Sequence, residues 1–126
     1  MIELSTRARV NADNFNWVDV NFIFDEDEPF LITMLIDYDT EVVEWDLGRM
    51  EMRDAMMGNW PSGVGDIIMI RFEGTFRIYL KNETEQCSLD FKLKDLKPFL
   101  METYNAVSHR QEQSMIEDEI DKWTSN

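Results

Sequence analysis

The sequence predicts an α+β fold with about seven antiparallel strands, a short helix after the fourth strand and helices at the C-terminal end. Most segments of residues 1–93 alternate apolar and polar side chains, which is the pattern of half-buried strands. The short helix at 48–57 is the exception within this region, and helical spacing takes over across 94–126. Strands followed by helices predict an antiparallel sheet covered by helices, within a single domain of residues 1–126.

The first four strands occupy the N-terminal third of the chain. In the first two segments the apolar side chains fall on even positions, so one face of each strand is buried. The third segment is apolar on both faces, which predicts a central strand. In the fourth, Val43, Trp45 and Leu47 share one face, and acidic residues separate them. These strands are expected at residues 2–10, 18–24, 30–38 and 41–47.

A short helix and three more strands follow. Apolar residues change to helical spacing at 48–57, and Gly58 is placed to end that helix. Glu73-Gly74 is a two-residue turn typical of a β-hairpin, of the kind that tolerates positive φ at its second position. The odd positions from 85 to 93 carry the apolar face of the last strand. These three strands are expected at residues 66–72, 75–81 and 85–93.

Two helices are predicted in 94–126. One apolar stripe runs along residues 96–107, with Pro98 in the first turn, where its missing N–H costs little. Ser114-Met115-Ile116-Glu117 matches the S-x-x-E capping box, which predicts a short terminal helix from Ser114. The polar stretch between the two helices contains His109, which is expected to be a solvated connector residue.

Composition and charge narrow the functional classes. Twelve basic and 26 acidic residues give a net charge of −14, which makes nucleic acid an unlikely partner because phosphates repel such a surface. A single cysteine and the lack of a signal-peptide pattern at the start predict a cytoplasmic protein. No apolar run approaches the roughly 18 residues needed to cross a bilayer, so no membrane span is expected.

The sequence offers no recognisable catalytic, cofactor-binding or metal-binding site, so the protein is expected not to be an enzyme. His109 is the only imidazole, and one histidine with Cys87 cannot complete a zinc site without several carboxylates. Residues 37–48 imitate a calcium loop but lack glycine at its sixth position and glutamate at its twelfth. Gly63-Val64-Gly65 lacks the third glycine of a dinucleotide fingerprint.

Apolar residues on and around the short helix and the terminal helix are the remaining candidates for function. Core packing is one explanation for these residues, and contact with another subunit or with a partner is the functional alternative. Methionine and tryptophan are enriched at protein interfaces, and nine methionines provide an adaptable contact surface. The candidate interface residues are Met50, Met56, Met57, Trp60, Ile116, Ile120 and Trp123.

Several segments resemble, in order and spacing, those of the SsgA-like sporulation and cell-division proteins of filamentous actinobacteria. Residues 43–49, V-E-W-D-L-G-R, are similar to the family's V-E-W-x-F-x-R-x-L stretch. Residues 25–30 resemble its acidic D-P-Y turn, and residues 96–107 resemble its A-L-x-x-F-L-x-x-T-x-x-V helix. With the acidic amphipathic end at 116–120, the resemblance spans roughly residues 18–123.

The resemblance implies a whirly-like fold assembled as a homotrimer without catalytic activity. Family members act as adaptors in sporulation-specific division, where they help to place the tubulin-like division protein and direct septum synthesis. The expected partner is therefore a protein of the division machinery, and the expected location includes division septa. An alanine-poor, Asn- and Met-rich composition and a short loop around Trp60 differ from typical members. They suggest a phage-borne or otherwise diverged relative that interferes with the host's division machinery or imitates one of its proteins.

Two alternative functions stay open. Whirly-like folds elsewhere bind single-stranded nucleic acid through basic, aromatic sheet surfaces. An acidic phage inhibitor or DNA mimic would instead need carboxylates spaced like phosphates on one face. The nucleic-acid alternative would need a cluster formed by Arg7, Arg9, Arg71, Arg77, Lys92 and Lys94.

Overall fold

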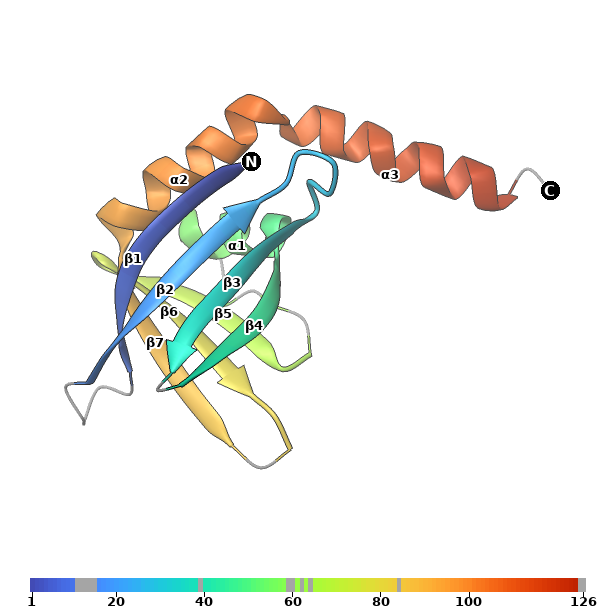
Figure 1. The fold of residues 1–126 in the computed structure, drawn as a ribbon. Helices are drawn as coiled ribbons and strands as arrows, with labels where there is room; N and C mark the ends of the chain where they lie inside the picture. The colour runs from blue at the N-terminus through green and yellow to red at the C-terminus, as the bar shows by residue number, and fades with distance from the viewer. Residues whose placement is uncertain are drawn as a thin grey trace.

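The computed structural model describes residues 1–10, 16–38, 40–58, 61, 63, 65–83 and 85–124. Within these residues seven strands precede two long helices, and a short helix separates the fourth and fifth strands (Figure 1). This is the α+β order that the sequence predicts. The elements are β1 (Ile2–Val10), β2 (Asn16–Phe24), β3 (Leu31–Tyr38), β4 (Glu41–Gly48), α1 (Arg49–Met56), β5 (Ile67–Phe72), β6 (Thr75–Lys81), β7 (Gln86–Lys92), α2 (Leu93–Ala106) and α3 (His109–Thr124).

The seven strands form one antiparallel sheet in the order β4-β3-β2-β1-β7-β6-β5. The sheet is strongly curled, so its two halves face each other (Figure 1). A short pairing joins the halves, in which Arg9 of β1 lies opposite Asp90 of β7 and Val10 lies opposite Leu89. Helix α2 lies across one end of the curled sheet beside β1, and α3 extends away from it (Figure 1).

The hydrophobic core fills the inside of the curl and the space under α2. Phe22 of β2 is fully buried, and its ring centroid lies 5.2 Å from that of Phe91 in β7. The same ring lies 6.0 Å from Phe99 of α2. These aromatic contacts connect both halves of the sheet to α2, and edge-to-face pairs add stability beyond the burial of their area.

The prediction of β3 as a central strand is wrong. β3 has a partner on each side, but it lies one strand from the β4 edge, and β1 occupies the centre. Only one face of β3 is buried: Ile32 and Met34 point into the core, whereas Leu31 is 39% exposed. Because this strand is apolar on its outer face as well, it leaves hydrophobic side chains available for contacts outside the core.

The hairpin between β5 and β6 is confirmed, since Phe72 pairs with Thr75 across the two-residue turn. Within this turn the residue with positive φ is the first one, Glu73, at 55°. The primed turns that suit hairpins require positive φ at the first central position, and here a non-glycine residue adopts it.

The predicted short helix is confirmed as α1, and Gly58 follows it with φ of 81°. The last strand ends one residue earlier than expected, because Leu93 begins α2. Pro98 is therefore the sixth residue of α2 rather than part of its first turn. Its missing N–H leaves one carbonyl of the preceding turn without a helix hydrogen bond. Pro98 is exposed, so water can reach this part of the helix.

The predicted start of the terminal helix at Ser114 is wrong. Helix α3 begins at His109 and has 16 residues, two more than α2. The functioning capping box is Ser108-x-x-Gln111: the Gln111 N–H donates to Ser108 Oγ at 3.1 Å, and the Ser108 N–H donates to Gln111 Oε1 at 2.8 Å. His109 is accordingly a residue of the first helical turn and not a connector residue.

We expect Phe22→Ala to lower the free energy of unfolding by about 3–5 kcal/mol, because it leaves a cavity where both sheet halves meet α2. The matched control is Phe72→Ala, since Phe72 is 40% exposed. This control should cost about 1 kcal/mol or less. Urea unfolding followed by circular dichroism measures both. Equal effects of the two substitutions would contradict the described core.

Candidate protein interface

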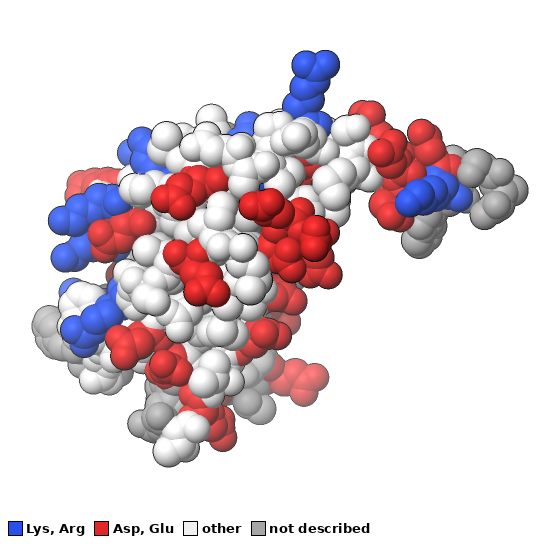
Figure 2. All heavy atoms as spheres, turned by 45° about the horizontal axis from the view of Figure 1, so that its top comes forward, with Lys and Arg blue, Asp and Glu red and all other residues white. Residues whose placement is uncertain are grey.

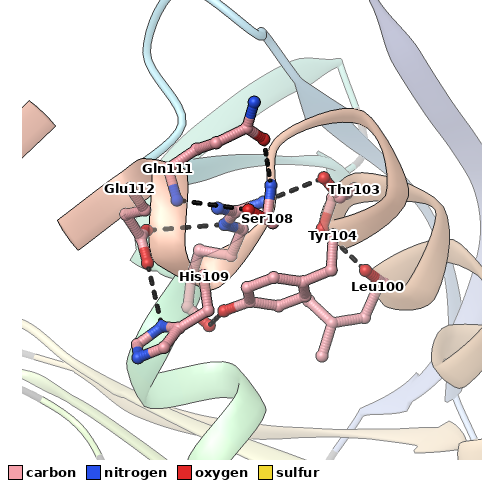
Figure 3. Close-up of polar contacts among 8 residues, drawn as sticks. Leu100, Thr103, Tyr104, Ser108, His109, Gln111 and Glu112 are labelled. Atoms are coloured by element: carbon pink, nitrogen blue, oxygen red, sulfur yellow. Dashed lines mark hydrogen bonds and ion pairs between the residues drawn. The ribbon is translucent and has the colours of Figure 1, made fainter. Parts of the chain in front are cut away.

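A buried arginine lies where the three helices meet. Arg49, the first residue of α1, is fully buried. Its Nη1 donates to the carbonyl oxygen of Thr103 in α2 at 2.9 Å, and its Nε lies 3.5 Å from Oε1 of Glu112 in α3. Figure 3 shows these polar contacts around the junction. One guanidinium therefore connects α1, α2 and the first turn of α3.

Aromatic rings surround the same guanidinium. The central carbon of Arg49 lies 4.0 Å from the centroid of the Tyr104 ring and 4.9 Å from that of Phe24. Arginine stacks well on aromatic faces because it is planar and weakly hydrated. Burial raises the pKa of Tyr104, while the positive charge of Arg49 opposes that rise. The phenol thus stays neutral over the physiological range and supplies a face to the cation.

Glu112 is the second buried charge of this junction, with a side chain only 3% exposed. Its Oε2 lies 3.6 Å from His109 Nδ1, which belongs to the same helical turn (Figure 3). Removal of one partner from such a pair leaves an uncompensated charge in the protein interior, which is strongly destabilising. The pair therefore fixes where α3 begins and the direction in which it leaves α2.

Beyond the buried Arg49–Glu112 pair, α3 extends past the sheet (Figure 1). The stripe that carries His109 and Glu112 continues, four residues further at each step, to Ile116 and Ile120. Ile116 is partly buried, and Ile120 is 56% exposed. The outer part of α3 thus presents apolar side chains next to acidic ones.

A groove lies between α3 and the main body of the protein, with a volume of about 620 Å³. Outer residues of β3 and α1 form one wall, and the apolar stripe of α3 forms the other. Four carboxylates lie among the lining residues, so we call it the acidic groove. It is lined by Phe30, Leu31, Asp46, Gly48, Met50, Glu51, Glu112, Ile116, Glu119 and Ile120.

A second groove, of about 390 Å³, lies between the end of α1, β5 and α2. Its apolar surface contains three methionines, and three cations lie around it, so we call it the methionine groove. Arg71 is held there by a 3.0 Å hydrogen bond from its Nη1 to the Met56 carbonyl oxygen. It is lined by Arg53, Met56, Met57, Arg71, Lys97, Leu100, Met101, Tyr104 and Asn105.

The candidate interface residues separate into these two grooves. Met50 lines the acidic groove with Ile116 and Ile120, although these residues are far apart in sequence. Met57 lines the methionine groove and is 61% exposed, whereas Met56 is buried and can form only its floor. Trp60 lies outside the described residues. Trp123 belongs to α3, but only its backbone is described. Their role in binding stays a prediction.

Sequence reasoning missed several residues of these surfaces. Met101 is 57% exposed on α2, but a stripe analysis selects only the buried face of a helix. Arg49 carried a signal, because it is the arginine of the V-E-W-x-F-x-R resemblance. The helix start at Ser108 could also have been found, since Ser108-x-x-Gln111 matches the capping-box pattern, whereas no sequence pattern marks Glu112.

The basic residues needed for a nucleic-acid surface do not form an unopposed cluster. Arg77 makes a bidentate pair with Asp90, with Nε to Oδ1 at 2.6 Å, and this raises the pKa of the guanidinium. Arg7 lies 3.7 Å from Asp19 on the neighbouring strand. Arg71 turns toward the methionine groove, and Lys94 belongs to α2. Carboxylates from adjacent strands thus oppose the strand arginines Arg7 and Arg77.

The reactive side chains of the described chain show no catalytic arrangement. Burial raises the pKa of the Cys87 thiol, and the negative charge of Glu85 raises it further. The thiolate is the nucleophilic form, so this environment lowers reactivity. Among the described residues, no group of three or more His, Cys, Asp or Glu side chains could hold a metal ion. None of the described helices is long and apolar enough to span a membrane.

A comparison with protein families shows which family the chain matches. The family model described as "Streptomyces sporulation and cell division protein, SsgA" matches residues 18–112, which is most of the sequence. The chain belongs to the SsgA family. The match begins at Val18 within β2, runs through α2, and ends in the first turn of α3 at Glu112, the buried partner of Arg49. A comparison with curated proteins finds no match.

Two solved structures share the fold of this SsgA-family protein. One comes from work on mutations in SsgB that correlate to longitudinal cell division during sporulation of Streptomyces coelicolor. It has a TM-score of 0.76 at 21% identity and covers 89% of this chain and 90% of that chain. The other is an SsgA-like sporulation-specific cell division protein from Thermobifida fusca, with a TM-score of 0.75 at 22% identity, covering 95% and 91%. The predicted SsgA-like α+β architecture is confirmed.

We expect Arg49→Met to lower the free energy of unfolding by about 3–5 kcal/mol, because it leaves Glu112 buried without its cation. The control is Arg7→Met, which removes an exposed pair and should change stability by about 1 kcal/mol or less. Urea unfolding of both variants tests this. Similar stability of the two variants would show that the buried pair does not hold the helices together.

We expect the Cys87 thiol to react more slowly with a colorimetric thiol reagent at pH 8 in the folded protein than in urea. The raised pKa reduces the thiolate fraction, and partial burial restricts access. A rate in the folded protein equal to or above that in urea would identify Cys87 as an activated thiol and reopen the question of catalysis.

Proposed function

We propose that this SsgA-family protein is a noncatalytic adaptor or regulator of sporulation-type cell division. In this proposal it binds a protein of the division machinery, assembles as a homotrimer, and acts in the cytoplasm and at division septa. Family membership is the observation that carries the proposal. The two grooves supply surfaces through which such binding can occur.

The apolar side chains exposed in the two grooves support protein binding. Met57, Met101 and Ile120 each expose more than half of their side-chain surface, next to charged residues. Specific interfaces combine an apolar centre with a polar rim, and both grooves have this composition. Methionine adapts its shape to a partner at low cost, since it is unbranched and polarizable.

The environments of His109 and Cys87 support the noncatalytic part of the proposal. These are the side chains best suited to act as an acid-base group and as a nucleophile. His109 is engaged by Glu112 at the start of α3, where its role is structural. The environment of Cys87 favours the neutral thiol. Neither lines the acidic groove or the methionine groove.

The observations do not favour the two alternatives. The strand arginines Arg7 and Arg77 lie beside carboxylates, which removes the basic surface that single-stranded nucleic acid would need. A DNA mimic requires carboxylates spread over one face. Figure 2 shows Asp and Glu over much of the visible face, with Lys and Arg among them at one side and near the end of α3, so the charge is mixed and not uniformly acidic.

The test is binding to a purified tubulin-like division protein from Streptomyces coelicolor, measured by fluorescence anisotropy of the labelled chain. We expect saturable binding, and no binding to a single-stranded oligonucleotide of comparable concentration. Light scattering of the chain alone should give about three times the 15.0 kDa chain mass. Oligonucleotide binding without division-protein binding would replace the proposal with the nucleic-acid alternative.

A further inference from the structure

The acidic groove and the methionine groove lie at opposite ends of α1. Each contains apolar residues, and the charged residues around the two grooves have opposite signs. The first turn of α1 contributes Met50 and Glu51 to the acidic groove. Its last turn and C-terminal cap contribute Arg53 and Met57 to the methionine groove. The helix has only eight residues, so it spans roughly 12 Å at 1.5 Å per residue. One molecule can therefore present both surfaces at once, each to a different neighbour.

The two surfaces complement each other in charge. The acidic groove has carboxylates from β4, α1 and α3, namely those of Asp46, Glu51 and Glu119, in addition to the buried Glu112. Three cations surround the methionine groove: Arg53, Arg71 and Lys97. In the part of the chain that the structure describes, none of these three lies within ion-pair distance of a carboxylate.

The two surfaces also match in their apolar parts. Met57 and Met101 project from the methionine groove and are 61% and 57% exposed. The acidic groove is a cleft with two apolar walls, formed by Leu31 and Met50 on one side and Ile120 on the other. Flexible methionine side chains can fill a cleft of this kind, and burial of both sets would remove apolar surface from water.

We propose that the methionine groove of one copy docks against the acidic groove of a second copy, in a head-to-tail contact. The inference rests on the homo-oligomer of the proposed function and specifies its interface. A chain with a net charge of −14 repels its own copies unless the contact brings opposite charges together. The methionine groove supplies that opposite charge. A head-to-tail contact between unlike surfaces closes into a ring when its rotation permits.

The test uses two substitutions that each disable one surface. Ile120→Glu places a charge in the acidic groove, and Met101→Glu places one in the methionine groove. The mass of each variant, measured by light scattering, should fall to that of a monomer. In an equimolar mixture, however, each variant retains the surface that the other has lost. The mixture should therefore form a species of two chains, which neither variant forms alone.

The matched control is Val42→Glu, which changes an apolar residue that is 62% exposed on β4 and lines neither groove. It should keep the mass of the unsubstituted chain, and circular dichroism should show that all three variants are folded. Monomeric variants that form no pair on mixing would overturn the head-to-tail contact. Unchanged masses of both variants would overturn the surface assignment and leave the homo-oligomer standing. A monomeric unsubstituted chain would overturn both, whereas binding to the division protein is measured independently.

Discussion

The structure depends on one buried cation, the guanidinium of Arg49. Its position follows from the sequence around it: β4 ends at Gly48, α1 begins at once, and the first helical side chain points inward under α2. Burial of a guanidinium is costly unless its charge and donors are engaged. Here a carbonyl of α2 accepts a hydrogen bond from Nη1, a carboxylate of α3 opposes the charge, and two aromatic rings cover it. Nε and Nη2 make no hydrogen bond with the described residues, so the carboxylate and the rings must offset much of the cost of burial. The position of all three helices is thus coupled to one side chain.

This coupling explains why α3 can serve as a binding element. A helix that leaves the sheet has few core contacts of its own, and an isolated helix of 16 residues is marginally stable in water. The Ser108 capping box and the buried Glu112 fix its first turn, so the remaining turns project in a defined direction. The acidic groove exists because of that direction. The methionine groove needs no such device, since the end of α1, β5 and α2 form it within the packed body.

Much of the fold was predictable from sequence. Alternation of apolar and polar residues located most of the strands, a run that is apolar on both faces located β3, and helical spacing located α1 and α2. The resemblance around residues 43–49 identified the family. Strand order was not predictable. The sequence of β3 is typical of a central strand because it is apolar on both faces, yet its outer face is partly exposed and Leu31 on that face lines the acidic groove. The terminal helix was misplaced because two capping boxes compete, and pattern alone does not reveal that Glu112 is buried against Arg49. Which residues line each groove depends on tertiary proximity, and periodicity in a single sequence does not contain that information.

The central claim has two parts. Arg49 holds the first turn of α3 in place, and a second copy of the chain covers the outer turns of α3. Amide hydrogen exchange of the unsubstituted chain at several concentrations tests it most directly. The account predicts that the first turn of α3, up to Glu112, is protected at every concentration. Residues 114–122 should gain protection as the concentration rises. Exchange of the outer segment that is fast and independent of concentration would contradict the account, and so would an unprotected first turn.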